Sequence, residues 1–210
     1  MNEEKLLGIY IKSDLKWSKQ IDKVVNDTNY VLSKLKRLRQ HLGKKELKIL
    51  ADGLFMSKLR YCLPVYAAES IRLEASEPKS TQLQKLQRNQ NKMLRTITGT
   101  RQRDHVRIAD LLQSTGFLSV NQSAAYGLLV EVWKAREFSV PVLGNILDRR
   151  RNDTRTLRSD SANVVAAMGQ DELSINCARL WNMSTPKFKN TNLLKVAKAE
   201  AKTLAKTLPI

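Results

Sequence analysis

The chain has 210 residues, and its 42% hydrophobic content excludes a wholly disordered protein and suffices for a packed core. Lysine and arginine number 37 against 20 acidic residues, and the net charge of +17 indicates a polyanionic partner, either nucleic acid or an anionic membrane surface. The charge favours nucleic acid over the alternative of an ordinary solvated surface. Two cysteines and two histidines are too few for a disulfide framework or a Cys/His metal site, so we expect no cofactor. No signal peptide or membrane-spanning run is recognisable, which predicts an intracellular protein, nuclear or cytoplasmic, that does not bind membranes.

The first predicted element is a strand, LLGIYI over residues 6–11, which needs a neighbouring strand to satisfy its backbone. The rest of the chain offers no strong strand candidate, so we expect this strand to lack a partner in the chain. A long amphipathic helix follows, which Gly43 is expected to end as a C-cap. Its apolar seam recurs every three or four residues, at Ile21, Val24, Thr28, Val31, Leu35, Leu38 and Leu42.

A second helix is predicted on Leu47, Leu50, Leu54 and Leu59, and it ends before Pro64. Residues 69–80 are polar and unperiodic, which is typical of a loop. A third helix follows in TQLQKLQRNQNKMLRTITG, and Gly99 ends it. Its apolar stripe is Leu83, Leu86, Met93, Leu94 and Ile97. A basic stripe with no acidic residue of its own lies on the opposite face, at Lys85, Arg88, Lys92 and Arg95.

Shorter helices are predicted from an N-cap at Asp104 to Gly116, and from Ser119 or Asn121 onward. In the second of these, Leu128, Val132 and Trp133 face a core. Residues 149–158 hold five arginines with few apolar anchors and predict an exposed basic loop. NCARLWN is a short helical piece, and the tail over residues 192–208 is a helix. Its lysines cluster on one side, at Lys195, Lys198, Lys202 and Lys206.

Catalytic signatures are nearly absent from the sequence. The adjacent acidic pairs, Glu3–Glu4 and Asp171–Glu172, have no site-like context, and no phosphate-binding glycine loop or nucleophile elbow occurs. We therefore expect no catalysis by this chain alone and no catalytic or metal-ligating residue. The basic clusters instead predict nucleic-acid binding. The candidate contacts are Lys85, Arg88, Lys92, Arg95, Arg101, Arg103, Arg107, Lys34 and Arg37.

Several segments, taken in order, resemble the reverse transcriptases of non-LTR (LINE-type) retrotransposons. LLGIYIKSDLKWSKQI resembles the stretch that closes the palm in that family, and KLRYCLPVYA and LQKLQRNQNKMLRTITGT resemble its next two blocks. RDHVRIADLLQSTGFLSVNQ, ARLWNMSTP and the final KTLPI resemble its C-terminal end. The chain departs from the family pattern at Cys62, at Tyr66 and over residues 183–185, where the family usually has Gly, Trp and a leucine–proline pair.

The resemblance implies a mainly α fold, with a thumb-like helical bundle, a second helical region and an N-terminal strand or hairpin left from the palm. Its implied division is a primer-grip remnant over 1–18, thumb-like helices over 19–68, a helical region with the basic stripe over 79–140, and a basic loop with C-terminal helices over 141–210. Leu7 and Gly8 would be primer-grip-like. The implied partners are an RNA/DNA template–primer duplex and the fingers and palm of the parent RNA-directed DNA polymerase, whose catalytic aspartates we expect upstream of Met1.

Two alternatives remain open at this point. The seam over residues 21–42 could pair with a partner helix, which would make the chain a stand-alone protein-interaction module. A metal-dependent nuclease would use Asp104, His105 and Asp110.

Overall fold

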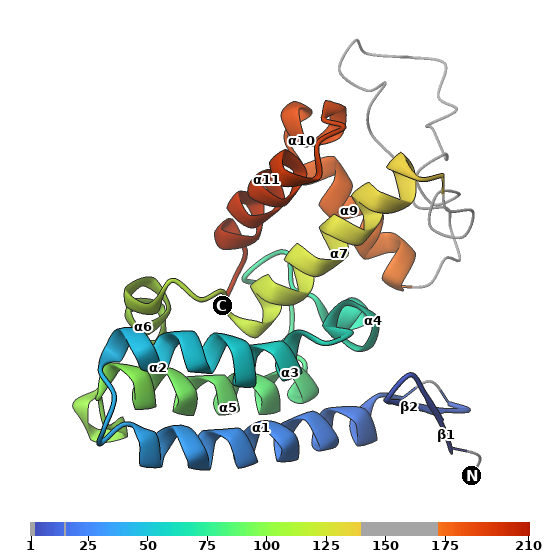
Figure 1. The fold of residues 1–210 in the computed structure, drawn as a ribbon. Coiled ribbons are helices and arrows are strands. Elements are labelled where there is room, and N and C mark those ends of the chain that lie inside the picture. Colours follow the sequence, from blue (N-terminus) through green and yellow to red (C-terminus); the bar gives the residue numbers. More distant parts are fainter. Residues whose placement is uncertain (1–2, 15, 140–171) are drawn as a thin grey trace, which may run out of the picture. The chain divides into compact units, whose positions relative to one another are not determined.

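The computed structural model describes residues 3–14, 16–139 and 172–210, and it is mainly helical with a short antiparallel hairpin at the N-terminus (Figure 1). The described chain forms two compact units. Unit 1 comprises residues 1–66, 78–120 and 210, and unit 2 comprises residues 67–77 and 121–209. This division differs from the sequential regions expected from the sequence, because each unit combines segments that are distant in the chain. The predicted basic loop at 149–158 lies outside the described residues.

The N-terminal strand has its partner within the chain, so the hairpin in the predicted fold class is confirmed and the expectation of an unpaired strand is wrong. β1 (Glu3–Leu6) and β2 (Ile9–Lys12) pair antiparallel, with Leu6 opposite Ile9. Leu7 and Gly8 form the turn, with φ of 47° and 86°. Two successive positive φ angles are typical of the tight hairpin turn whose twist matches that of the strands. Sequence analysis missed the turn because leucine is unfavourable at its first position, where the left-handed backbone costs about 1–2 kcal/mol.

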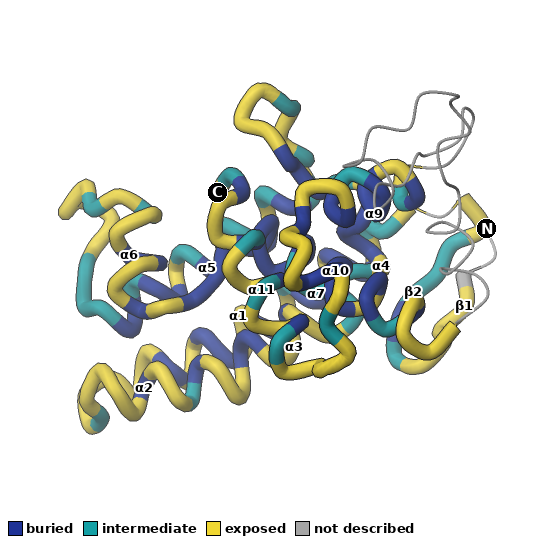
Figure 2. The backbone as a smooth tube through the Cα atoms, turned by 90° about the horizontal axis from the view of Figure 1, so that it is seen from above, coloured by how far each residue is buried: buried dark blue, intermediate teal, exposed yellow. Residues whose placement is uncertain are grey.

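α1 (Ser18–Leu38) and α5 (Thr81–Thr98) form the centre of unit 1. The predicted apolar stripe of α5 is confirmed as buried, and so is that of α1 from Ile21 to Leu35; Ile21, Leu35 and Leu86 are at most 1% exposed. Buried positions alternate with exposed ones along these helices (Figure 2). Hydrogen bonds between them show that they run in the same direction: Lys85 to Asp22 (2.9 Å), Asn89 to Thr28 (2.6 Å) and Arg39 to Gly99 (3.3 Å).

α1 ends at Leu38, earlier than predicted, and Gly43 is not its C-cap. Gly43 has φ −73° and ψ 172° and precedes the first residue of α2 (Lys44–Leu50), so it is the N-cap of the next helix. Leu38 is 37% exposed and Leu42 half-buried, whereas the earlier seam residues are buried. The seam therefore covers α5 inside unit 1, and its apolar side chains are not available to a partner helix in this fold.

The second predicted helix is continuous from Lys44 to Arg60 but contains a π-helical segment. α2 passes into η1 (Ala51–Met56) and then into α3 (Ser57–Arg60). The buried positions are Leu47, Ala51, Phe55, Met56 and Leu59. In an α-helix, side chains spaced four residues apart rotate around the helix axis by about 40° at each step. The π-helical segment has more residues per turn, so it keeps these side chains on the same side of the helix. Leu54, predicted for the apolar face, is consequently 46% exposed.

Three short elements complete unit 1. α4 (Leu63–Ala67) lies where unit 1 ends, η3 (Gln102–Asp104) is a single turn after α5, and α6 (Ile108–Thr115) follows. Gly116, with φ 72°, is the C-cap of α6, as predicted. Asp104 is not its N-cap, because α6 begins later, after Arg107, and the Asp104 carboxylate instead accepts the Arg101 N–H within the turn.

Unit 2 contains η2 (Ala68–Ser70), most of α7 (Val120–Glu137), α9 (Glu172–Met183), α10 (Pro186–Asn190) and α11 (Leu194–Thr207). Leu128, Val132 and Trp133 are buried, as expected. Trp181 contacts Phe188 edge to face, with ring centroids 5.9 Å apart. Within the described residues, no helix combines the length and apolar character needed to cross a membrane.

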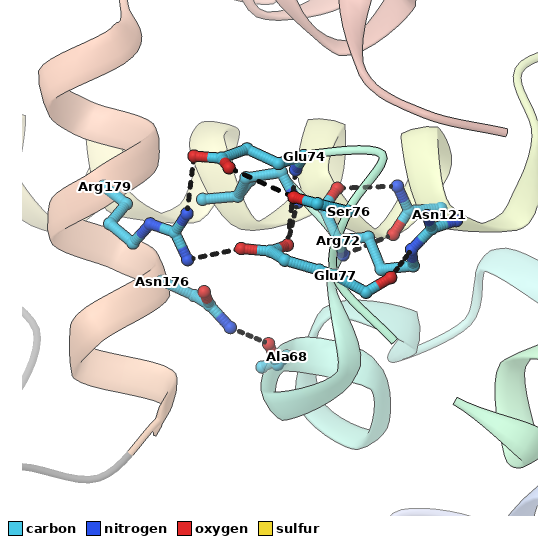
Figure 3. A network of polar contacts seen from close by, with 9 residues as sticks. Ala68, Arg72, Glu74, Ser76, Glu77, Asn121, Asn176 and Arg179 are labelled. Carbon is cyan, nitrogen blue, oxygen red and sulfur yellow. Dashed lines mark hydrogen bonds and ion pairs between the residues drawn. The ribbon is translucent and has the colours of Figure 1, made fainter. Parts of the chain in front are cut away.

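The predicted loop over residues 69–80 is irregular but tightly bound in unit 2 (Figure 3). The Arg72 N–H donates to Asn121 Oδ1 (2.8 Å), and Asn121 Nδ2 donates back to the Arg72 carbonyl (2.9 Å). Glu77 accepts the Leu73 N–H (2.6 Å) and forms an ion pair with Arg179 (2.8 Å). These contacts bind the segment to α7 and α9, and the Arg72–Asn121 pair is buried, whereas Glu69, Glu74 and Lys79 remain exposed.

Candidate nucleic-acid interface

The basic stripe of α5 faces solvent, as the helical period predicts. Lys85, Arg88 and Lys92 are exposed, and Arg95 is half-buried. The opposite face carries Leu86, Met93 and Leu94, which are all fully buried. The position of the stripe thus follows from the burial of the apolar face, because helix residues three and four positions apart share one side.

Two members of the stripe, Lys85 and Arg95, form contacts within the protein. Lys85 forms an ion pair with Asp22 of α1, with Nζ and Oδ1 2.9 Å apart. The expectation of a stripe without a compensating acid is therefore wrong for Lys85, because the acid comes from the neighbouring helix. Arg88 and Lys92 have no ion-pair partner among the described residues.

Arg95 organises the loop that follows α5. Its guanidinium donates to the Arg101 carbonyl (3.0 Å) and to the Val106 carbonyl (3.2 Å). Guanidinium groups suit this role because their N–H groups diverge in a fixed fork. Arg95 therefore has a structural role in holding the loop that carries Arg101.

The loop over residues 99–107 extends the basic surface beyond the helix end. Gly99 ends α5 in the left-handed conformation (φ 84°), and its carbonyl accepts a hydrogen bond from Arg39 (3.3 Å). The exposed arginines of the loop are Arg101, Arg103 and Arg107. Cations near a helix C-terminus also interact favourably with the partial negative charge there. We call Arg88, Lys92, Arg101, Arg103 and Arg107 the α5 surface.

Lys34 and Arg37 lie on a different surface. Both are exposed on α1, on the side opposite its buried face. Lys34 Nζ lies 4.4 Å from the centroid of the Tyr30 ring, and Tyr30 is 63% exposed. A hydrogen bond from Lys34 and its positive charge lower the pKa of the Tyr30 hydroxyl below its ordinary value. The structure thus divides the predicted contacts between α5 and the outer side of α1.

The predicted primer-grip residues form the tip of the hairpin. The Leu7 side chain is 81% exposed, and the Leu7 carbonyl accepts a hydrogen bond from the Tyr61 hydroxyl (2.7 Å). The Gly8 carbonyl accepts from Lys23 Nζ (3.1 Å). These bonds fix the tip against α1 and the end of α3, and leave the leucine side chain outside.

Tyr10 is a residue that sequence analysis missed. Three ammonium groups lie within 6 Å of its ring centroid, those of Lys19 (4.7 Å), Lys23 (5.6 Å) and Lys5 (5.8 Å). Lys5 is directly opposite Tyr10 in the hairpin, while the other two come from α1. The signal in the sequence was the lysine pair spaced by four residues, but its convergence on Tyr10 depends on how the hairpin packs.

The residues of the nuclease alternative are all at the surface. Asp104, His105 and Asp110 are exposed, and the Asp104 carboxylate accepts the Arg101 N–H. Among the residues that the structure describes, no group of three or more His, Cys, Asp or Glu side chains could hold a metal ion. Nothing in this geometry converges on a reacting atom.

Unit 2 carries a basic face of its own on α11. The four lysines noted in the sequence are exposed, whereas Ala197, Ala201 and Ala205 are buried. Glu200, the acidic residue of this helix, forms an ion pair with Lys187 (3.0 Å). The four lysines have no ion-pair partner among the described residues. We call Lys195, Lys198, Lys202 and Lys206 the α11 surface.

Comparison of the chain with protein-family models, with curated proteins and with solved structures found no match.

Proposed function

We propose that this chain binds nucleic acid through the phosphate backbone, without sequence selectivity, as the non-catalytic part of a LINE-type reverse transcriptase. The observation that carries the binding proposal is the α5 surface, where five exposed cations lie on one helix face and the loop after it. Side chains of this kind neutralise phosphates and release the condensed counterions. The family assignment rests on the ordered sequence segments alone.

The polymerase resemblance gives the ligand its form, a template–primer duplex. In that arrangement the hairpin tip with Leu7 and Gly8 would contact the primer or the palm, and the helices of unit 1 would follow the duplex. The protein-interaction alternative has less support, because the seam of α1 is buried against α5 in the same chain. The family origin is tested by reading the genomic sequence upstream of Met1 for a palm with its paired aspartates.

The α5 surface is tested by replacing Arg88, Lys92, Arg101 and Arg103 with Gln. Arg95 and Lys85 are left intact, because one supports the loop and the other is paired with Asp22. Loss of four phosphate contacts should reduce the magnitude of the slope of log K against log[salt] for duplex binding by roughly 3 to 4. Duplex affinity is measured by fluorescence anisotropy across a salt series.

The matched control removes the same charge elsewhere in unit 1. Lys36, Lys45, Lys58 and Lys79 are exposed, form no ion pair with a described residue, and lie apart on α1, α2, α3 and the segment before α5. Their replacement by Gln should change the slope by less than one. Equal slopes for the two variants would show that only the net charge matters and would contradict a defined α5 surface.

A further inference from the structure

The outer side of α1 combines lysines with an exposed aromatic ring. At about 100° per residue, six positions fall within an arc of about 80° on the side opposite the buried face. They are Lys19, Lys23, Asn26, Tyr30, Lys34 and Arg37, and no acidic residue falls within this arc. We call these six residues the α1 ridge. α1 lies at the lower edge of unit 1 in Figure 1.

Tyr30 lies in the middle of the ridge. Its side chain is 63% exposed, so it contributes little to the core, and Lys34 Nζ lies 4.4 Å from its ring centroid. A cation at this distance interacts with the ring electrons. The ring is therefore presented at the surface within a positive environment.

In the hairpin before α1, a second tyrosine ring, that of Tyr10, also lies beside lysine side chains. Lys19 and Lys23 of the ridge both lie over Tyr10, at 4.7 and 5.6 Å. Two hydrogen bonds fix this arrangement, from the Tyr10 N–H to Gln20 Oε1 (3.1 Å) and from Lys23 Nζ to the Gly8 carbonyl (3.1 Å). Two tyrosines of a single compact unit thus lie beside cations of α1, Tyr10 beside Lys19 and Lys23 and Tyr30 beside Lys34.

Aromatic rings between cations suit unpaired nucleotides better than a duplex. The faces of paired bases are covered by their neighbours in the stack, whereas an unpaired base can place a face on tyrosine while its phosphate contacts lysine. We propose that the α1 ridge binds single-stranded nucleic acid by stacking on Tyr30, separately from the duplex that the proposed function assigns to the α5 surface of the same unit. This inference takes its ligand class from the proposed function and adds the single-stranded form.

The test compares a fluorescein-labelled 12-nucleotide oligothymidylate with a 12-base-pair duplex, both by anisotropy at one salt concentration. Tyr30→Ala should weaken binding of the single strand by about 5- to 150-fold, the range that loss of one stacked base gives. Duplex affinity should stay within about twofold. Tyr30→Phe keeps the ring and should retain single-strand affinity within about twofold.

Phe138→Ala provides a matched control, because Phe138 is an aromatic residue that is 69% exposed in unit 2 and should affect neither ligand. Unchanged single-strand affinity in Tyr30→Ala, or an equal loss for strand and duplex, would overturn the stacking proposal. Failure of the proposed function would give a different result. The unaltered protein would then not bind duplex with a steep salt dependence, whatever the effect of Tyr30→Ala on single-strand binding.

Discussion

Arg95 shows how a residue that looks like a ligand contact can be a structural one. It occupies a position in the basic stripe of α5, yet its guanidinium donates to two backbone carbonyls of the following loop. The charge remains near the surface, but the side chain is positioned by the protein. Substitution of Arg95 would therefore change the loop as well as the charge, and its effect on binding would not identify a phosphate contact.

Glu77 gives the clearest pH-dependent feature among single residues. Burial acts to raise the pKa of its carboxyl, but hydrogen bonds from the Leu73 N–H, from Arg179 and from the Glu74 N–H outweigh burial, so the pKa lies below its ordinary value. A lowered pKa means that the folded state favours the charged form. The stabilisation is present above the ordinary pKa of about 4.3 and is lost as pH falls through the lower pKa of the folded state.

We therefore expect the free energy of unfolding to fall as pH is lowered from 5 to 3, and to fall less steeply in Glu77→Gln. Urea denaturation at several pH values, followed by circular dichroism, measures both slopes. Glu69→Gln is the control, because Glu69 is exposed in the same segment and forms no hydrogen bond or ion pair with a described residue. An identical pH slope in Glu77→Gln and the unaltered chain would refute the role of Glu77.

At the scale of the element, helix ends determine where the candidate contacts lie. Gly99 ends α5 in the left-handed conformation, and the chain then turns so that three arginines follow on the exposed loop. A Cβ at Gly99 would lie 2.8 Å from Arg39 Nη2. Gly99 is thus required by its φ of 84°, whereas the exposed Arg39 side chain can move away from an added Cβ.

Gly99→Ala is expected to lower the free energy of unfolding by about 1–2 kcal/mol, the cost of a left-handed alanine. Gly53→Ala should do the opposite, because Gly53 is helical with nothing within 4 Å of the added Cβ, and alanine is favoured there by about 0.5–1 kcal/mol. Urea denaturation compares the two. A destabilised Gly53 variant would show that the π-helical segment needs glycine for its own geometry.

Regular periodicity could be predicted from the sequence, whereas contacts between distant segments could not. The α5 stripe and the α1 stripe up to Leu35 are buried as their spacing predicts, and Gly99 and Gly116, though not Gly43, end their helices as expected. Leu54 was misplaced because a π turn leaves no signature in the hydrophobic pattern. The pairing of Lys85 with Asp22 could not be predicted, because it joins residues 63 positions apart.

At the scale of the whole molecule, the excess of 17 positive charges is divided unequally, with 13 in the sequence of unit 1 and 4 in that of unit 2. The α5 surface belongs to unit 1 and the α11 surface to unit 2. The apolar side of α11 is used for packing, since Ala197, Ala201 and Ala205 are all buried. The exposed side of α11 therefore carries the lysines of the α11 surface, whose charge attracts polyanions without selecting a sequence.

Replacement of the four lysines of the α11 surface with Gln tests whether unit 2 takes part in binding. If it does, the magnitude of the slope of log K against log[salt] for a long duplex should fall by roughly 3 to 4. In a variant with eight substitutions, the four on α11 and the four on the α5 surface, the magnitude of the slope should fall by roughly 7. A normal slope in the α11 variant on long duplex would confine binding to unit 1, and the positive charge of unit 2 would then need another explanation.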